Sequence, residues 1–147
     1  MRITHKELTK SLESELEKVY TIYGDETLFI QETLEKIRVY AAKQGYEERS
    51  TQVVTKDFNW SKLNSDSENR DMFSSKKIVE LKMLGVGPGV AGSKALIEYI
   101  QNPNQDQILI LTAEGLDKKS SSSAWAKEME LKGAFITIPK LRSGEII

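Results

Sequence analysis

Ile108-Leu109-Ile110-Leu111 is an aliphatic stretch without a polar residue, which is typical of a parallel strand buried on both faces of a sheet. Four other runs rich in β-branched and apolar residues accompany it, and amphipathic helical patterns lie between them. Strands that alternate with helices over crossovers of this length predict an α/β fold with a doubly wound, mostly parallel five-stranded sheet flanked by helices. The other predicted strands are 19–23, 46–54, 78–84 and 135–138, and the main helices are 26–44, 92–100 and 120–132.

Three segments carry more detailed expectations. Thr4 and Glu7 have the spacing of a capping box, and leucines follow at helical intervals, so we expect a short amphipathic helix over residues 5–17. The strand at 46–54 is polar, which favours a position near a sheet edge. In the helix at 120–132, four residues are expected to face the core: Ala124, Trp125, Met129 and Leu131.

Composition narrows the possible chemistry. The chain has 147 residues and no cysteine, so we expect one domain and no disulfide framework, thiolate nucleophile, iron–sulfur cluster or cysteine zinc site. The lone histidine, His5, leaves no Ser/His dyad and no multi-histidine metal site. We therefore expect neither a metal nor a cofactor.

The net charge and the hydropathy of the chain indicate which partners and which cellular location to expect. The 22 acidic and 21 basic side chains give a net charge of -1, which provides no long-range attraction for nucleic acid. No apolar run has the length of a membrane span or of a secretory signal. We expect a cytoplasmic protein with no membrane partner.

The turn after the first predicted strand reads Gly24-Asp25-Glu26-Thr27. Nucleotide-binding α/β domains hold phosphates at this place, on the amino end of the following helix. A phosphate-binding loop needs glycines for bare backbone amides and a lysine for the outer phosphates. This turn has one glycine, and the carboxylates of Asp25 and Glu26 repel a triphosphate. We expect a capped tight turn that binds no nucleotide.

A second glycine-rich segment, residues 87–94, reads Gly-Pro-Gly-Val-Ala-Gly-Ser-Lys and nearly matches the phosphate-loop pattern, in which the lysine precedes Ser or Thr. The exchange matters because adjacent helical residues point about 100° apart, and Pro88 also removes one amide. A surface loop is therefore favoured over a nucleotide site. The alternative function, a small nucleoside-triphosphate-binding enzyme, would use Gly87, Gly92, Ser93 and Lys94.

Met72 and Phe73 are the only apolar residues from Ser67 to Lys77. On a helix their side chains diverge by about 100°, so one inner face does not easily take both. From the residues alone, closing the end of the core under a loop is the favoured role. The alternative is a projecting hydrophobic plug that docks in a partner's pocket.

The features from residue 19 to residue 125 also follow the order of a known family. The strand at 19–23 leads into Gly24-Asp25-Glu26, and the helix then opens with Leu28-Phe29-Ile30-Gln31-Glu32. This order resembles the delta subunits of bacterial DNA polymerase III, and the similarity spans nearly the whole chain. It continues through 41–48, Asp57-Phe58-Asn59-Trp60, the strand from Ile78, 108–111, 116–118 and Ala124-Trp125.

The resemblance implies a clamp-loader subunit whose N-terminal domain has a P-loop NTPase type of fold with a degenerate phosphate loop. In this family the segment before the third strand carries the motif Gln-x-x-x-Leu-Phe, whose Leu-Phe pair enters a pocket on the beta sliding clamp. Here Phe73 matches, Met72 replaces leucine and Glu68 replaces glutamine. The resemblance thus implies that these three residues bind the clamp and that the subunit opens the ring for loading on primed DNA.

The resemblance also implies the chain's place in a larger assembly. Family members continue into a small helical domain and a collar domain, so residues 1–147 are expected to be the N-terminal domain alone. The gamma/tau and delta prime subunits would be bound mainly through the absent C-terminal domain, and DNA only indirectly or weakly. No catalysis is expected of this chain, although the complex is a DNA-directed DNA polymerase, a nucleotidyltransferase, of the cytoplasmic, nucleoid-associated replisome.

A third possibility is a domain similar to a response regulator. Such a domain needs an acidic cluster at two strand ends and a lysine after a late strand, and the sequence lacks that combination.

Overall fold

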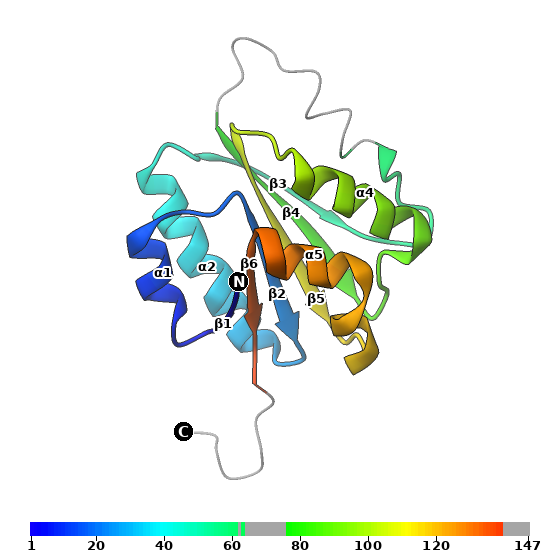
Figure 1. Cartoon of the computed structure of the whole chain (residues 1–147). Coiled ribbons are helices and arrows are strands. Elements are labelled where there is room, and N and C mark those ends of the chain that lie inside the picture. The colour runs from blue at the N-terminus through cyan, green and yellow to red at the C-terminus, as the bar shows by residue number, and fades with distance from the viewer. Residues whose placement is uncertain (62, 64–75, 140–147) are drawn as a thin grey trace.

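The computed structural model describes residues 1–61, 63 and 76–139. These residues form one parallel six-stranded sheet with helices on both faces (Figure 1). The strand order across the sheet is β1-β6-β2-β5-β4-β3. In chain order the elements are β1 (Arg2–Thr4), α1 (Leu8–Ser14), β2 (Val19–Gly24), α2 (Thr27–Lys43), β3 (Glu48–Val53), β4 (Lys77–Leu84), α4 (Gly89–Gln101), β5 (Gln107–Glu114), the 3-10 helix η1 (Lys118–Ser122), α5 (Ala124–Lys132) and β6 (Ala134–Thr137).

The two faces of the sheet support two separate hydrophobic clusters. Helices α1 and α2 cover one face, and α4 and α5 cover the other (Figure 1). Successive residues of β5 belong to opposite clusters: Ile108 and Ile110 pack toward α2, whereas Leu109 and Leu111 pack toward α4 and α5. Seven of the eight β5 residues are buried, so the predicted central parallel strand and the doubly wound α/β fold are confirmed.

The sheet has one strand more than the five predicted. Residues 2–4 form β1, which pairs with β6. The first helix is shorter than the expected 5–17 at both ends, because it begins at Leu8 and ends at Ser14. The capping-box residues close a turn instead: Glu7 accepts hydrogen bonds from the backbone N–H and the hydroxyl of Thr4. These bonds, the backbone bond first, hold the pKa of Glu7 below its ordinary value. A strand of three residues is too short to show the alternation of apolar and polar residues from which strands are predicted.

The polar strand β3 lies at the sheet edge, as its composition predicts, with five of its six residues exposed. Of the four residues expected to face the core in the helix at 120–132, two are buried. Trp125 and Met129 are buried, but Ala124 is exposed and Leu131 is 74% exposed. Leu131 follows Met129 by two residues, which on a helix turns its side chain about 200° away from that buried face.

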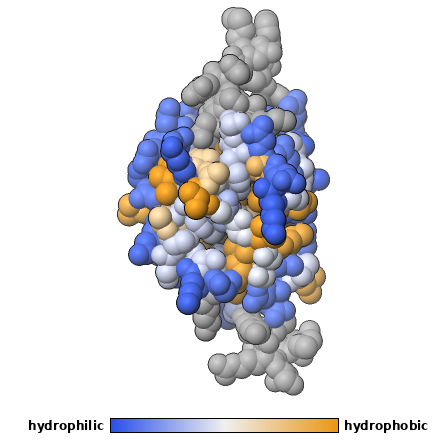
Figure 2. Space-filling view, turned by 90° about the vertical axis from the view of Figure 1, so that its right-hand side faces the viewer, coloured by the Kyte–Doolittle hydropathy of each residue, from blue (hydrophilic) through white to orange (hydrophobic). Residues whose placement is uncertain are grey.

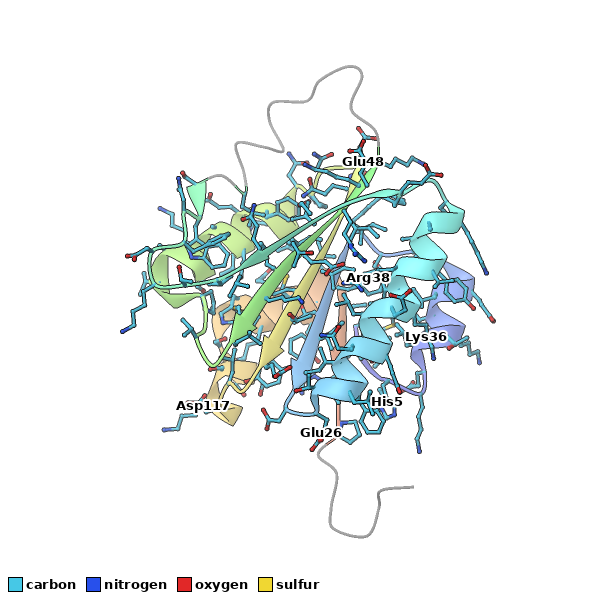
Figure 3. The ribbon with its side chains drawn as sticks, turned by 180° about the vertical axis from the view of Figure 1, so that it is seen from behind. His5, Glu26, Lys36, Arg38, Glu48 and Asp117 are labelled. Atoms are coloured by element: carbon cyan, nitrogen blue, oxygen red, sulfur yellow. The ribbon has the colours of Figure 1, made fainter. Side chains whose placement is uncertain are left out.

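A buried ion pair joins α2 to the sheet. Glu80 of β4 is fully buried, and Arg38 of α2 donates to both of its carboxylate oxygens, through Nε at 2.7 Å and Nη2 at 2.6 Å. Figure 3 shows Arg38 extending from α2 toward the strands. From the edge strand, the hydroxyl of Thr51 lies 3.5 Å from the same carboxylate, and the Nε of Arg49 lies 3.9 Å from it. The contact thus ties three elements together.

Replacing Arg38 with alanine tests how much this ion pair contributes to the free energy of unfolding. Breaking one side of a buried ion pair leaves an uncompensated charge and costs about 3–5 kcal/mol, so chemical denaturation of Arg38→Ala should show a loss of unfolding free energy in that range. The control is Lys132→Ala, because Lys132 and Glu128 form a surface pair at 3.7 Å, of a kind worth at most about 1 kcal/mol. Equal losses in the two variants would contradict a special role for the buried pair.

Candidate functional site

The expected phosphate position lies at the carboxyl edge of the sheet, between β2 and α2. The strand ends at Gly24 and the helix begins at Thr27, so only Asp25 and Glu26 connect them. Both ends of this turn are bound to the end of β5. The Asp25 Oδ1 accepts a hydrogen bond from the N–H of Gly115 at 3.1 Å, and the Thr27 hydroxyl donates to Glu114 Oε2 at 3.1 Å. These contacts close the turn against the end of β5, but no described side chain caps the amino end of α2, so the expected side-chain cap is absent.

Gly24 is required here by a close approach rather than by the need for a free amide. A Cβ on Gly24 would lie 2.6 Å from the Cβ of Ile138, which follows β6. The Ile138 N–H also donates to the carbonyl of Tyr23 at 2.8 Å. Real carbon atoms do not pack at such a separation, so only glycine lets β6 and the following residues continue alongside β2.

The surroundings of this turn are acidic. Glu26 and Asp117 lie at the same end of the molecule (Figure 3), together with Asp25 and Glu114. The backbone N–H of Ser120, followed by its hydroxyl, donates to Asp117 and holds the pKa of that carboxyl below its ordinary value. Several carboxylates at one strand edge disfavour a polyphosphate through like-charge repulsion. The charge at this edge is therefore unfavourable for a polyphosphate, and the absence of nucleotide binding at residues 24–27 stays a prediction.

The alternative nucleotide segment, 87–94, is largely helical. Helix α4 begins at Gly89, and the N–H of Gly92 already donates to the carbonyl of Pro88 at 3.2 Å. Gly92 is buried, and a Cβ there would lie 2.6 Å from the indole Cε2 of Trp60. The Gly92 amide is thus already hydrogen-bonded, and the Trp60 ring fills the space beside its Cα. A phosphate loop needs such amides free, so the arrangement is unfavourable for a triphosphate.

Ser93 and Lys94 lie in a groove between α4 and the start of α5. The groove has a volume of about 720 Å³ and also includes Val90, Ile97 and Trp125 in its lining.

The side of the molecule in Figure 2 shows separate hydrophobic areas divided by hydrophilic residues. A single large apolar patch would mark a docking surface, and this side does not display one among the described residues.

The described residues contain neither a metal-binding cluster nor a membrane-spanning helix. No group of three or more His, Asp or Glu side chains in that part of the chain is placed to hold a metal ion. Within the same residues, no helix is long and apolar enough to cross a membrane.

The predicted plug residues Glu68, Met72 and Phe73 lie outside the described residues. The chain on either side of them is described and well anchored. Leu63 is 8% exposed within the cluster that α4 and α5 cover. On the other side, the Lys76 Nζ donates to the carbonyl of Gln44 at 3.3 Å.

Comparison with known proteins agrees with this architecture. The model of the family "DNA polymerase III, delta subunit" matches residues 20–138. The chain belongs to this family. Its members named DNA polymerase III subunit delta include the Escherichia coli K12 protein, 25% identical over 137 residues, and the Haemophilus influenzae protein, 29% identical over 124 residues. The matches cover 93% and 84% of this chain but only 40% and 36% of those relatives.

Solved structures share the delta fold. A Bacillus subtilis DNA clamp loader delta protein superposes with a TM-score of 0.72 at 22% identity, over 97% of this chain and 44% of that one. A Thermotoga maritima protein related to the DNA polymerase III gamma subunit gives a TM-score of 0.57 at 9% identity, over 96% and 47% of the two chains. At these identities the comparison concerns the fold alone.

Sequence reasoning missed two contacts that shape this delta-family domain. The buried Glu80 pairs with Arg38, which lies 42 positions away in the chain. Trp60 packs against Gly92, a glycine that the sequence analysis assigned to a possible nucleotide loop. Neither partner follows from a local pattern, although a glutamate inside an apolar strand and a glycine inside a helix are signals that some partner exists.

Replacing Gly24 with alanine tests the close approach at the carboxyl edge. The methyl group would meet Ile138 at 2.6 Å, and overpacking of this kind costs about 1–3 kcal/mol, so thermal denaturation should show a clearly lower Tm. Gly87→Ala is the matched control, because a methyl group there meets no atom within 4 Å. An unchanged Tm for Gly24→Ala would show that the edge adapts freely.

Titration calorimetry with magnesium and ATP tests both possible nucleotide positions. We expect no binding heat from the wild-type chain, because the 24–27 turn is closed and acidic and the Gly92 amide is already bonded. Lys94→Ala should give the same result. A saturable heat that disappears in Lys94→Ala would instead establish the nucleotide-binding alternative.

Proposed function

We propose that this chain is the N-terminal module of a clamp-loader delta subunit, which binds the beta sliding clamp and opens the ring for loading on primed DNA. Membership of the delta family carries the proposal. The closed, acidic turn at 24–27 supports it, because that turn favours a subunit that binds a partner rather than one that turns over ATP. In this proposal Met72 and Phe73 supply the hydrophobic anchor, and Glu68 adds a polar contact.

The energetics of a two-residue anchor are sufficient for this role. Burying a methionine or phenylalanine side chain contributes about 1.5–3 kcal/mol each. A ligand opens a ring only to the extent that it binds the open state more tightly than the closed one. If most of the anchor's contacts form only on the open ring, the two side chains shift the equilibrium by several orders of magnitude.

The remaining partners follow from the same proposal. ATP hydrolysis belongs to partner subunits. The other loader subunits, gamma/tau and delta prime, contact delta mainly through its C-terminal domain. The balanced charge of this chain, -1 overall, fits a module whose contacts with DNA are weak or indirect. The assembly acts in the cytoplasm, at the replisome.

Surface plasmon resonance against the cognate beta clamp tests the anchor. We expect Phe73→Ala to weaken binding by about 2 kcal/mol or more, roughly 30-fold, as truncation of an interface anchor does. Met72→Ala/Phe73→Ala should abolish measurable binding while the variant still melts cooperatively. Glu68→Gln restores the family's glutamine and should strengthen binding.

The matched control removes two apolar side chains elsewhere. Val90 and Leu131 are 90% and 74% exposed, and Val90→Ala/Leu131→Ala should bind the clamp as the wild type does. A Phe73→Ala variant that loses thermal stability yet keeps its affinity would place Phe73 in the core and refute the anchor.

A further inference from the structure

The outer edge of β3 is open among the residues that the structure describes. β3 pairs with β4 on one side, and no other described strand lies beyond it. The N–H of Val54, directly after the strand, donates to the carbonyl of Lys82 on β4 at 2.8 Å. Because successive residues of a strand direct their backbone groups to opposite sides, those of Arg49, Thr51 and Val53 point away from β4. An exposed edge of this kind is a template for another strand.

The sequence and the register of β3 do not block such pairing. Many edge strands are protected by a proline or by a bulge. β3 contains no proline, and it pairs with β4 in one uninterrupted register, from Glu48 opposite Lys77 to Val53 opposite Lys82. Five of its six residues are exposed. The edge can therefore accept a further strand along its whole length.

Positive side chains flank this edge on the face that α2 covers. Arg49 lies on β3 itself, and Lys82 lies opposite Val53 on β4. The Arg49 side chain is 48% exposed, and its Nε lies 3.9 Å from Glu80, whose carboxylate already binds Arg38. Arg49 also borders a cavity of about 500 Å³, which leaves room for a carboxylate beside the guanidinium. Among the described residues, Lys82 forms no ion pair.

These charges decide between two kinds of strand that could pair here. A second copy of the chain would bring its own Arg49 and Lys82 to the same face of a joined sheet, and like charges on neighbouring strands disfavour pairing. An acidic strand would place carboxylates beside the two cations, and opposite charges on neighbouring strands stabilise pairing. In strand addition the backbone bonds supply affinity, and such side-chain contacts supply specificity.

We propose that the outer edge of β3 binds an extended, acidic segment of a partner protein, which adds to the sheet as a further strand. Acidic residues at alternate positions of that segment face Arg49 and Lys82, because alternate side chains of a strand share one face. The residues that carry this proposal are not those of the proposed clamp anchor, so its test does not depend on clamp binding.

Amide hydrogen exchange, followed by nuclear magnetic resonance on the whole chain, tests the edge. The probe is a capped octapeptide that alternates threonine with glutamate, which places every carboxylate on one face of an extended strand. Saturating peptide should slow exchange at the amides of Arg49, Thr51 and Val53 about tenfold or more, because each gains a hydrogen-bond partner. The amides of Ser50 and Gln52 point toward β4 and should change little.

The control peptide has lysine in place of each glutamate and the same backbone. It should bind far more weakly, because its charges face two cations. Equal binding of the two peptides overturns the proposal, and so does the absence of binding by the acidic peptide. Saturable binding that leaves the three outward amides unprotected also overturns it, since the contact would then be electrostatic without strand addition.

Thr51→Pro tests the backbone contact directly. Proline lacks the N–H group, and the amide of Thr51 points away from β4, so the substitution keeps the bonds to β4 and is of a kind that edge strands tolerate. The variant should lose peptide binding while it still melts cooperatively. Thr51→Val keeps the N–H and is the matched control, which should bind as the wild type does. A folded Thr51→Pro with wild-type affinity overturns the proposal.

A charge variant covers the case in which Thr51→Pro does not fold. Arg49→Gln/Lys82→Gln keeps the backbone edge and should weaken peptide binding about fivefold, as expected for the loss of two exposed ion pairs. Lys10→Gln/Lys36→Gln removes the same charge from exposed positions on α1 and α2 and should have little effect. Equal affinities for the two double variants overturn the proposal.

The chain without peptide gives the remaining outcome. Sedimentation should show a monomer whose outward β3 amides exchange freely. A concentration-dependent dimer in which the same amides become protected would identify a second copy as the occupant and overturn the acidic segment.

Discussion

Burial of β5 on both faces is the constraint on which the other elements depend. Its aliphatic residues alternate between two clusters, so a helical layer must cover each side of the sheet. The parallel neighbours β2 and β4 pair along its length, and every connection between parallel strands must cross over a face. The carboxyl ends of β2 and β5 consequently meet at one edge. The same burial that stabilises the domain thus creates the place where a ligand would be expected.

Protein groups occupy that edge instead. In a nucleotide-binding domain, the phosphates supply the negative charge that the exposed amides at a helix start require. Here Asp25 and Thr27 tie the turn to the end of β5, through the Gly115 amide and Glu114, and the carboxylates of Asp25 and Glu26 bring the chain's own negative charge next to the start of α2. Ile138 fills the space beside Gly24. An edge held by its own side chains needs no ligand to set its geometry, which is consistent with the proposed role as a binding module.

The sequence predicts features that depend on neighbouring residues in the chain. It does not predict contacts between residues that lie far apart in the chain. The run Ile108–Leu111 predicts a central strand because burial on both faces leaves a continuous aliphatic pattern, and the acidic turn at 24–27 shows directly why a phosphate is disfavoured there. Glu80 could not be interpreted in the same way, because its partner Arg38 lies on another element. Gly92 was predicted to begin a helix and, in the alternative function, to belong to a nucleotide loop, but it serves a close approach of Trp60, and only the tertiary structure shows that contact.

The connection between β3 and β4 is held at its two described ends by opposite faces of the sheet. Val54, Trp60 and Leu63 follow β3 and are buried in the cluster that α4 and α5 cover. At the other end, the Lys76 Nζ lies 5.3 Å from the ring centre of Tyr46, a member of the opposite cluster. The edge strand β3 exposes five of its six residues, so it buries little apolar surface of its own. The residues that flank it therefore supply packing that the strand itself lacks.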